Sequence, residues 1–383
     1  MRERSEQSGQ FFLGRSAELA IIGEKVDRLG IEHQPVVIIR GEPGIGKTAL
    51  LNQVAGELRQ RLDMKMAIID ASLESHAPHS CMLELFGQIT GKTSSREAKL
   101  NTTFTEIGIF SDQGEYGKEY RGLIKDVLRG LDKKKLKLVI GVDNLSVCDW
   151  SKLSEIDQYF LFPLAGEKNI LFILAEDRKG YPYKTPEIDP LAQAITLEGL
   201  AKAETRQLLE SHNLQLQSAE LEEVISISGG NPFIALTLAQ APDLTDELTK
   251  LVEIFTPPNL EQADEFLKKF CVFDAIDEDK IRALMKPAGS ESCSYAEAMR
   301  IRRNFCQAGL ISYDEVSVGY IIPENWRRVI EEQLKRTDLS AWKDYQKAAG
   351  EYYLSLVFQY PQAEAEIKQR WLKKAQEHKE KSN

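Results

Sequence analysis

The fold is decided by residues 36–48, which read Val36-Val37-Ile38-Ile39-Arg40-Gly41-Glu42-Pro43-Gly44-Ile45-Gly46-Lys47-Thr48. The first five residues form a short apolar run, which is typical of a buried strand. A GxxxxGKT spacing follows, and a helical pattern begins directly after it. A strand, a glycine-rich turn and a helix start in this order bring main-chain N–H groups and the positive end of a helix dipole together. The stretch therefore predicts a loop that binds phosphate.

The side chains of this loop predict a nucleoside triphosphate, most simply ATP or ADP with Mg²⁺. We expect the Lys47 ammonium to contact the β- and γ-phosphate oxygens and the Thr48 hydroxyl to ligate Mg²⁺. The expected nucleotide contacts from the loop are Glu42, Pro43, Gly44, Ile45, Gly46, Lys47, Thr48 and Ala49.

A second acidic position follows another apolar run, Leu138–Asp143. Asp143 is expected to hold Mg²⁺ through a water molecule. The next residue is Asn144, and an amide can orient water but cannot accept its proton. We therefore expect slow hydrolysis, or a base from elsewhere, for which Asp149 and Asp177 are candidates by position alone.

Apolar runs and helical patterns alternate through the first half of the chain. This alternation predicts βαβ units and a parallel sheet. The expected strands are 35–40, 66–71, 136–143, 170–175 and 194–197, and the clearest expected helices are 47–62 and 120–131. Residues 91–117 are polar and predict a surface excursion.

The second half has mainly helical patterns. Three of them (263–273, 277–285 and 295–308) precede two alternating runs (310–313 and 316–322), which is the order of a winged helix. We expect a frayed N-terminus (1–10), a nucleotide-binding core (11–197), a helical lid (198–255), a winged-helix domain (256–335) and a helical tail (336–383). Within the tail, a helical pair is expected at 341–356, and the charge run 373–381 predicts a solvated or frayed end.

Composition fits a globular protein of more than one domain. The 383 residues are 42% hydrophobic and 28% charged, with a net charge of −10. The five cysteines include no CxxC pair, which favours reduced thiols and a cytoplasmic location. We expect no membrane segment. His76, His79 and Cys81 lie close together, but a zinc site would need a fourth ligand, and we expect no metal there.

Several motifs together resemble the STAND branch of P-loop ATPases, near the AAA+ and archaeal origin-initiator ATPases. They are Phe12-Leu13-Gly14-Arg15-Ser16-Ala17-Glu18-Leu19, the phosphate loop, the Asp143 strand, residues 170–174 with Arg178, Leu197-Glu198-Gly199-Leu200 with Glu204, and Gly229-Gly230-Asn231-Pro232. The resemblance implies a three-layer α/β P-loop ATPase with a helical lid and a C-terminal winged helix. It also implies that Gly14 and Arg15 lie near the adenine and ribose, that Arg178 senses the γ-phosphate, and that Asn231-Pro232 contacts the nucleotide.

The same resemblance implies a switch that changes conformation or assembly with the bound nucleotide. Protein partners would then supply sensing or output, and self-association would depend on the nucleotide. Relatives of this type place a winged-helix His on the ADP β-phosphate, but this chain has Tyr320-Ile321-Ile322-Pro323 at that point. A lock on ADP through His is therefore not expected.

The alternative is an initiator or transcription regulator that binds DNA through the winged helix. Arg300, Arg302 and Arg303 lie on the expected recognition helix and could contact phosphates or guanine. Residues 261–335 hold 14 acidic residues but only 11 Lys or Arg, a balance that disfavours strong phosphate binding. A regulatory arm is therefore the favoured interpretation of this domain.

Overall fold

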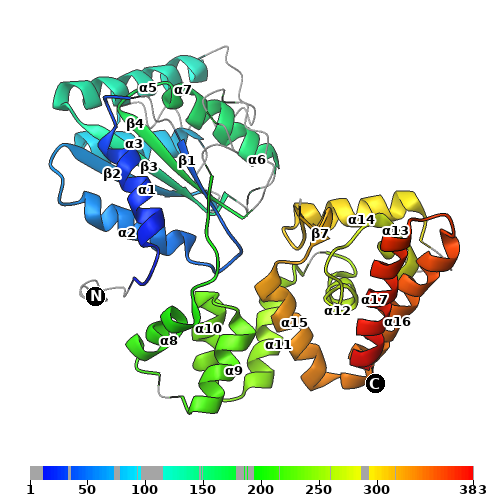
Figure 1. The fold of residues 1–383 in the computed structure, drawn as a ribbon. Coiled ribbons are helices and arrows are strands. Elements are labelled where there is room, and N and C mark those ends of the chain that lie inside the picture. The colour runs from blue at the N-terminus through cyan, green and yellow to red at the C-terminus, as the bar shows by residue number, and fades with distance from the viewer. Residues whose placement is uncertain are drawn as a thin grey trace. The chain divides into compact units, whose positions relative to one another are not determined.

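The structure, a computed structural model, divides into two compact units, residues 1–198 and 199–383, and each is described by itself (Figure 1). It describes residues 12–32, 36–72, 78–92, 94–95, 115–145, 148, 150–177, 185, 188, 194–214, 216–258, 260–285, 293–314 and 316–382.

The N-terminal unit is built on a parallel sheet of five strands in the order β2-β3-β4-β1-β5. The strands are β1 (Val36–Arg40), β2 (Met64–Asp70), β3 (Lys137–Asp143), β4 (Ile170–Glu176) and β5 (Ala194–Thr196). All five expected strands are present, with ends that differ from the prediction by one or two residues. Nearly every residue of β1, β3 and β4 is buried, which is why these strands show as continuous apolar runs rather than alternating ones.

Helices cover both faces of this sheet and make three layers (Figure 1). Val37 and Ile39 of β1 pack into a core with α1 (Ser16–Asp27) and α2 (Lys47–Leu58). Val36 and Ile38 point to the other face. That face is covered by α3 (Pro78–Thr90), α5 (Glu115–Lys134), α6 (Trp150–Glu155), a π-helical segment (Ile156–Leu161) and α7 (Phe162–Ala165). The expected three-layer α/β fold is confirmed.

The C-terminal unit begins with four helices: α8 (Lys202–Ser211), α9 (Ser218–Ser228), α10 (Pro232–Ala239) and α11 (Leu244–Phe255). Three more follow: α12 (Ala263–Phe270), α13 (Glu278–Leu284) and α14 (Tyr295–Gln307). The strands β6 (Ser312–Asp314) and β7 (Gly319–Ile321) then form an antiparallel hairpin, followed by α15 (Glu324–Thr337). Three helices and a hairpin appear in the order that a winged helix requires.

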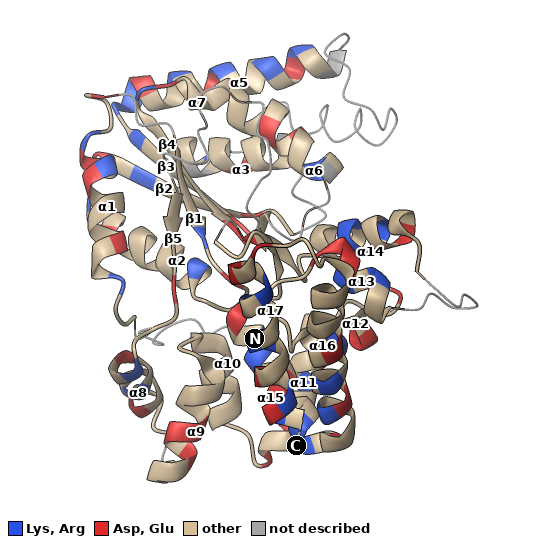
Figure 2. Ribbon diagram, turned by 45° about the vertical axis from the view of Figure 1, so that its right-hand side comes forward, with Lys and Arg blue, Asp and Glu red and all other residues tan. Residues whose placement is uncertain are grey.

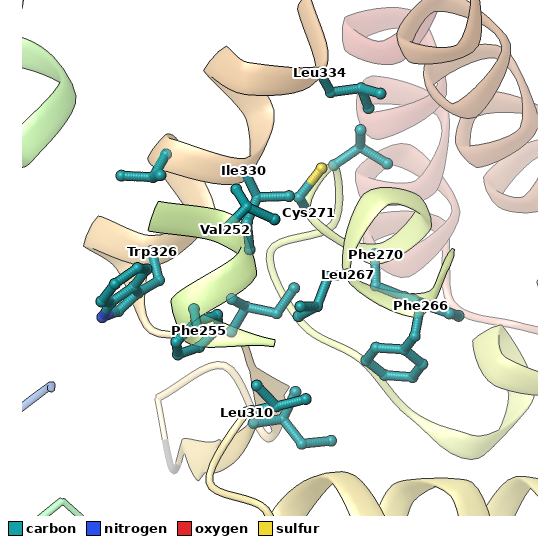
Figure 3. Packing of buried hydrophobic residues seen from close by; sticks show 14 of the residues in the cluster. Val252, Phe255, Phe266, Leu267, Phe270, Cys271, Leu310, Trp326, Ile330 and Leu334 are labelled. Carbon is teal, nitrogen blue, oxygen red and sulfur yellow. The ribbon is translucent and has the colours of Figure 1, made fainter. Parts of the chain in front are cut away.

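One hydrophobic core runs through this unit, from α8 to α16. Figure 3 shows its centre, where Phe255 of α11 and Trp326 of α15 stack with ring centroids 4.5 Å apart and planes 8° apart. Phe266 and Phe270 of α12 belong to the same cluster, on the far side of Leu267 in this view. Aromatic pairs of this kind bury large areas and pack in defined geometries, so they join α11 to the helices that follow it.

The tail differs from the prediction in two ways. Residues 341–356 are not a helical pair but part of one helix, α16 (Leu339–Gln359), which continues through Gly350. The partner helix is α17 (Ala365–Ser382), which carries the charge run. That run is not frayed, because Ala375 and His378 are buried against α16.

Helices that could cross a membrane are absent from the part of the chain that the structure describes, since none there is both long and apolar enough.

Candidate phosphate-binding site

The loop between β1 and α2 has the backbone that its glycines predict. Gly44 and Gly46 adopt positive φ angles of 81° and 103°, which side chains with a Cβ rarely tolerate. Gly46 is also the residue that precedes the first turn of α2. At Gly41 the constraint is space, since a Cβ there would lie 2.7 Å from a methyl carbon of Ile45. The loop is therefore a tight turn that ends on a helix N-terminus, a geometry suited to anions.

Lys47 is held at the mouth of this loop by three acceptors. Its ammonium donates to the carbonyl oxygens of Gly41 at 2.9 Å and Glu42 at 3.0 Å. It also forms an ion pair with Asp177, the residue that follows β4. An ammonium group has three N–H donors, so these acceptors account for all of them.

Thr48 and Asp143 meet although 95 residues separate them in sequence. The Thr48 hydroxyl donates to Oδ2 of Asp143 at 2.6 Å. A hydroxyl and a carboxylate side by side at a helix N-terminus are oxygen donors of the kind that Mg²⁺ prefers. Together with Lys47 and the loop amides, these residues fit a nucleotide phosphate chain with Mg²⁺.

Asn144 is paired with Asp70, for which the sequence predicts no role. Its side-chain amide donates to Oδ1 of Asp70 at 2.9 Å, and its own backbone is left-handed, with φ 58°. Asp70 also accepts from the main chain and hydroxyl of Ser72 at 2.9 and 2.6 Å. Asp70 ends β2, and the sheet register places it opposite Asp143. The only sequence signal was an acid at the end of a strand, which is too common to single it out.

Two further contacts lie next to the loop, one at the end of β1 and one on the loop's main chain. Arg40 and Glu176, which end β1 and β4, form a buried ion pair at 2.7 Å. Arg15 donates to the carbonyl oxygens of Ile45 at 3.3 Å and Glu198 at 2.6 Å. Arg15 thus holds the loop through its main chain, and it follows Gly14 in a pair of left-handed residues.

Of three other expected site residues, two lie outside the described ranges and one forms an ion pair. Arg178 and Asp149 are outside the residues that the structure describes. Asp177 is described, and its carboxylate is paired with Lys47. Its role as a general base stays a prediction.

Asn231 and Pro232 lie in the C-terminal unit, where they start α10. The buried Asn231 side chain accepts from the main-chain N–H groups of Phe233 at 3.1 Å and Ile234 at 3.3 Å. Pro232 occupies the first helical position, where its missing N–H costs nothing. The motif is therefore a helix start, and its contact with a nucleotide stays a prediction.

The arginines of α14 are not equivalent. Arg302 donates to the Tyr320 hydroxyl at 2.5 Å and pairs with Glu278 at 2.6 Å, so it joins α14 to the hairpin and to α13. Arg300 and Arg303 are exposed. Figure 2 shows Lys and Arg interspersed with Asp and Glu over the helices of this unit. Mixed charge of this kind weakens the case for a phosphate-binding face.

Of the three side chains named as a possible zinc site, only that of Cys81 is described. His76 and the His79 side chain lie outside the described residues, and burial raises the pKa of the Cys81 thiol to about 12, which disfavours the thiolate that a metal needs. Within the described ranges, no group of three or more His, Cys, Asp or Glu side chains could hold a metal ion.

A parallel sheet, a glycine-rich loop before a helix, and a Lys, Thr and Asp at its mouth define a P-loop nucleotide-binding protein. Residues 12–173 match the family model described as the AAA ATPase domain. This segment is accordingly an AAA ATPase domain, a nucleotide-binding domain for ATP or ADP, typically with Mg²⁺. A comparison with the curated proteins gives no match.

Solved structures with similarity to this chain include three archaeal proteins. A Signal Transduction ATPase with Numerous Domains (STAND) protein with a tetratricopeptide repeat sensor, from Pyrococcus horikoshii, is 15% identical with a TM-score of 0.37. The match covers 98% of this chain but 55% of that one. The ORC1 protein of Aeropyrum pernix, solved with DNA, is 13% identical with a TM-score of 0.43 and coverage of 85% and 93%. The Cdc6p of Pyrobaculum aerophilum is 13% identical with a TM-score of 0.43 and coverage of 87% and 97%.

Proposed function

We propose that this chain is a STAND-type switch that binds ATP and hydrolyses it slowly. The observation that carries the proposal is the cluster of Lys47, Thr48 and Asp143 at the carboxyl edge of the sheet. Their groups are those that a Mg²⁺-triphosphate needs, namely an ammonium, a hydroxyl and a carboxylate. When bound, Mg²⁺ would neutralise charge on the phosphate chain, with Thr48 and Asp143 as the residues that hold it.

Slow turnover follows from the residue after Asp143. Asn144 cannot accept a proton from water, because an amide is not a base at neutral pH. Its N–H donors face Asp70, as the 2.9 Å contact indicates, which leaves its oxygen to accept a hydrogen bond from water. We assign Asn144 the orientation of the attacking water and Asp70 the positioning of Asn144.

The output of the switch would come through the C-terminal unit. Because one core joins the lid helices to the helices and hairpin that follow, we propose that they respond as one body. ATP and ADP can shift the arrangement only by the difference in their affinities for its two states. Protein partners would bind one of the two states, and self-association would depend on the nucleotide in the same way. DNA binding through Arg300 and Arg303 remains the rival, and it predicts salt-dependent binding of duplex DNA.

The experiment that tests the phosphate site is Lys47→Ala. Charge-assisted hydrogen bonds contribute about 1.5–3 kcal/mol, so ATP should bind about 10- to 150-fold more weakly. Equilibrium titration with ATP in the presence of Mg²⁺ measures this directly. Lys65→Ala is the matched control, because Lys65 is an exposed lysine of β2, and its affinity should equal that of the parent chain. Full affinity in Lys47→Ala would refute the proposal.

A further inference from the structure

Lys47 of the phosphate loop forms an ion pair with Asp177. The side chains of Lys47 and Asp177 are 10% and 22% exposed, so the pair is largely shielded from solvent. The neighbouring carboxylate, Glu176, is neutralised by Arg40 instead. Two consecutive acids, the last residue of β4 and the one after it, thus pair with different cations, and the second pairs with the lysine that a phosphate chain requires.

The sheet fixes this carboxylate at the phosphate end of the site. β1 leads into the loop and pairs in parallel with β4, with Arg40 opposite Glu176. The carboxyl ends of parallel neighbours meet at one edge, so Asp177 leaves its strand where the loop leaves β1. It cannot be withdrawn far without breaking the end of β4, whose last residues are fully buried.

We propose that Asp177 is a specificity-determining residue that lowers the preference of this site for ATP over ADP. A P-loop lysine serves the β- and γ-phosphates, so the terminal phosphate must share Lys47 with the carboxylate or displace it. Like charges close together in a shielded site repel strongly. ADP lacks the γ-phosphate and is bound more through the loop amides, so the carboxylate lowers the affinity for ADP less than that for ATP. The site favours retention of the diphosphate.

The inference rests on the proposed function, since it concerns the phosphate end of the same site. Its test is Asp177→Asn, which keeps the shape and removes the charge. Dissociation constants for ATP and ADP with Mg²⁺ are measured by equilibrium titration. We expect ATP to bind about tenfold more tightly and ADP about threefold or less, so that the ATP/ADP preference rises. Asp177→Ala should shift the preference in the same direction.

The matched control is Asp63→Asn. Asp63 lies before β2, at the opposite edge of the sheet, and its side chain is 53% exposed. Both constants should stay unchanged there. An unchanged or lowered ATP/ADP preference in Asp177→Asn would overturn the inference, because Asp177 would then position Lys47 for the nucleotide rather than compete with it. Failure of the parent chain to bind either nucleotide would instead refute the proposed function.

Discussion

Asp70 and Asn144 meet across two neighbouring strands, and this contact sets what the residue after Asp143 can do. An amide side chain can present either its oxygen or its N–H groups to a ligand. Because Asp70 accepts from the amide nitrogen, the orientation of Asn144 is determined by a residue 74 positions away. The contact links the end of β2 to the chemistry at the end of β3.

Asp70→Ala should therefore slow ATP hydrolysis with little effect on ATP affinity. Loss of orientation of a water-holding group is expected to lower kcat about 10- to 100-fold. Steady-state hydrolysis and equilibrium binding, measured on the same samples, separate the two effects. Asn144→Ala should give a similar loss, and the double variant should be no slower than Asn144→Ala alone, because the two residues act as a unit. Losses that multiply in the double variant would show that the residues act independently.

At the scale of elements, a close crossing of two segments shapes the start of the C-terminal unit. The Leu200 N–H donates to the Gly230 carbonyl at 2.8 Å, so the segment before α8 lies directly on the turn between α9 and α10. A Cβ on Gly199 would press into the Gly229 carbonyl group, and one on Gly230 into Leu200. These glycines are required by backbone proximity, and Gly230 also by its φ of 85°.

Gly199→Ala should destabilise the C-terminal unit by about 1–3 kcal/mol, the usual cost of an overpacked contact. Urea unfolding followed by tryptophan fluorescence reports mainly on this unit, which holds three of the four tryptophans, Trp326, Trp342 and Trp371. The control is Gly56→Ala in α2, where nothing lies within 4 Å of the added Cβ. That substitution should be neutral or stabilise its unit by about 0.5–1 kcal/mol. Equal changes in the free energy of unfolding for Gly199→Ala and Gly56→Ala would show that close backbone contact at Gly199 does not limit stability.

The packing of α17 on α16 should make stability depend on pH. Desolvation, with a smaller contribution from Lys381, lowers the pKa of His378, whose Nδ1 lies 2.7 Å from the Gln346 side-chain oxygen. The unfolded chain therefore takes up the proton more readily than the folded one. Stability should be full above the ordinary His pKa of about 6.5 and decline as pH falls below it.

Urea unfolding of the C-terminal unit between about pH 5 and pH 7.5 measures this effect. His378→Gln removes the titrating ring and should flatten the part of the profile that this residue causes. Greater stability at the acidic end in the parent chain would contradict the assignment.

At the scale of the whole molecule, the proposed switch requires that ATP and ADP favour different states. Exchange of ADP for ATP should change the hydrodynamic radius or the rate of limited proteolysis, because the nucleotide would alter the conformation or assembly of the chain. Analytical ultracentrifugation and trypsin digestion, with each nucleotide in turn, measure the two quantities. Lys47→Ala should need about 10- to 150-fold more ATP for the same response. Identical radii and digestion rates in ATP and ADP would refute the switch, while leaving nucleotide binding intact.

The parts of the fold whose signal is local can be predicted from consecutive residues. The run 36–48 carries the strand, the turn and the helix start in consecutive residues, so it predicted the loop, Lys47 and Thr48. The apolar runs of the buried strands likewise predicted the five-stranded parallel sheet, and the strand that ends at Asp143 was identified because burial on both faces leaves a continuous apolar stretch. The order of helices and hairpin in the second half was predicted from helical spacing and from two short alternating runs.

Which distant side chains meet follows from the folded arrangement of the strands and helices. The pairing of Asn144 with Asp70, and of Lys47 with Asp177, depends on sheet register and strand order, which no local spacing encodes. The tail shows the same limit. The charged side chains of the run 373–381 are largely exposed, as expected, but the run is part of α17 and buries His378, which no local pattern indicates. The physical reason is that ion pairs and hydrogen bonds depend on distance in space and not on separation in sequence. Their partners are therefore known only once the fold brings the groups into contact.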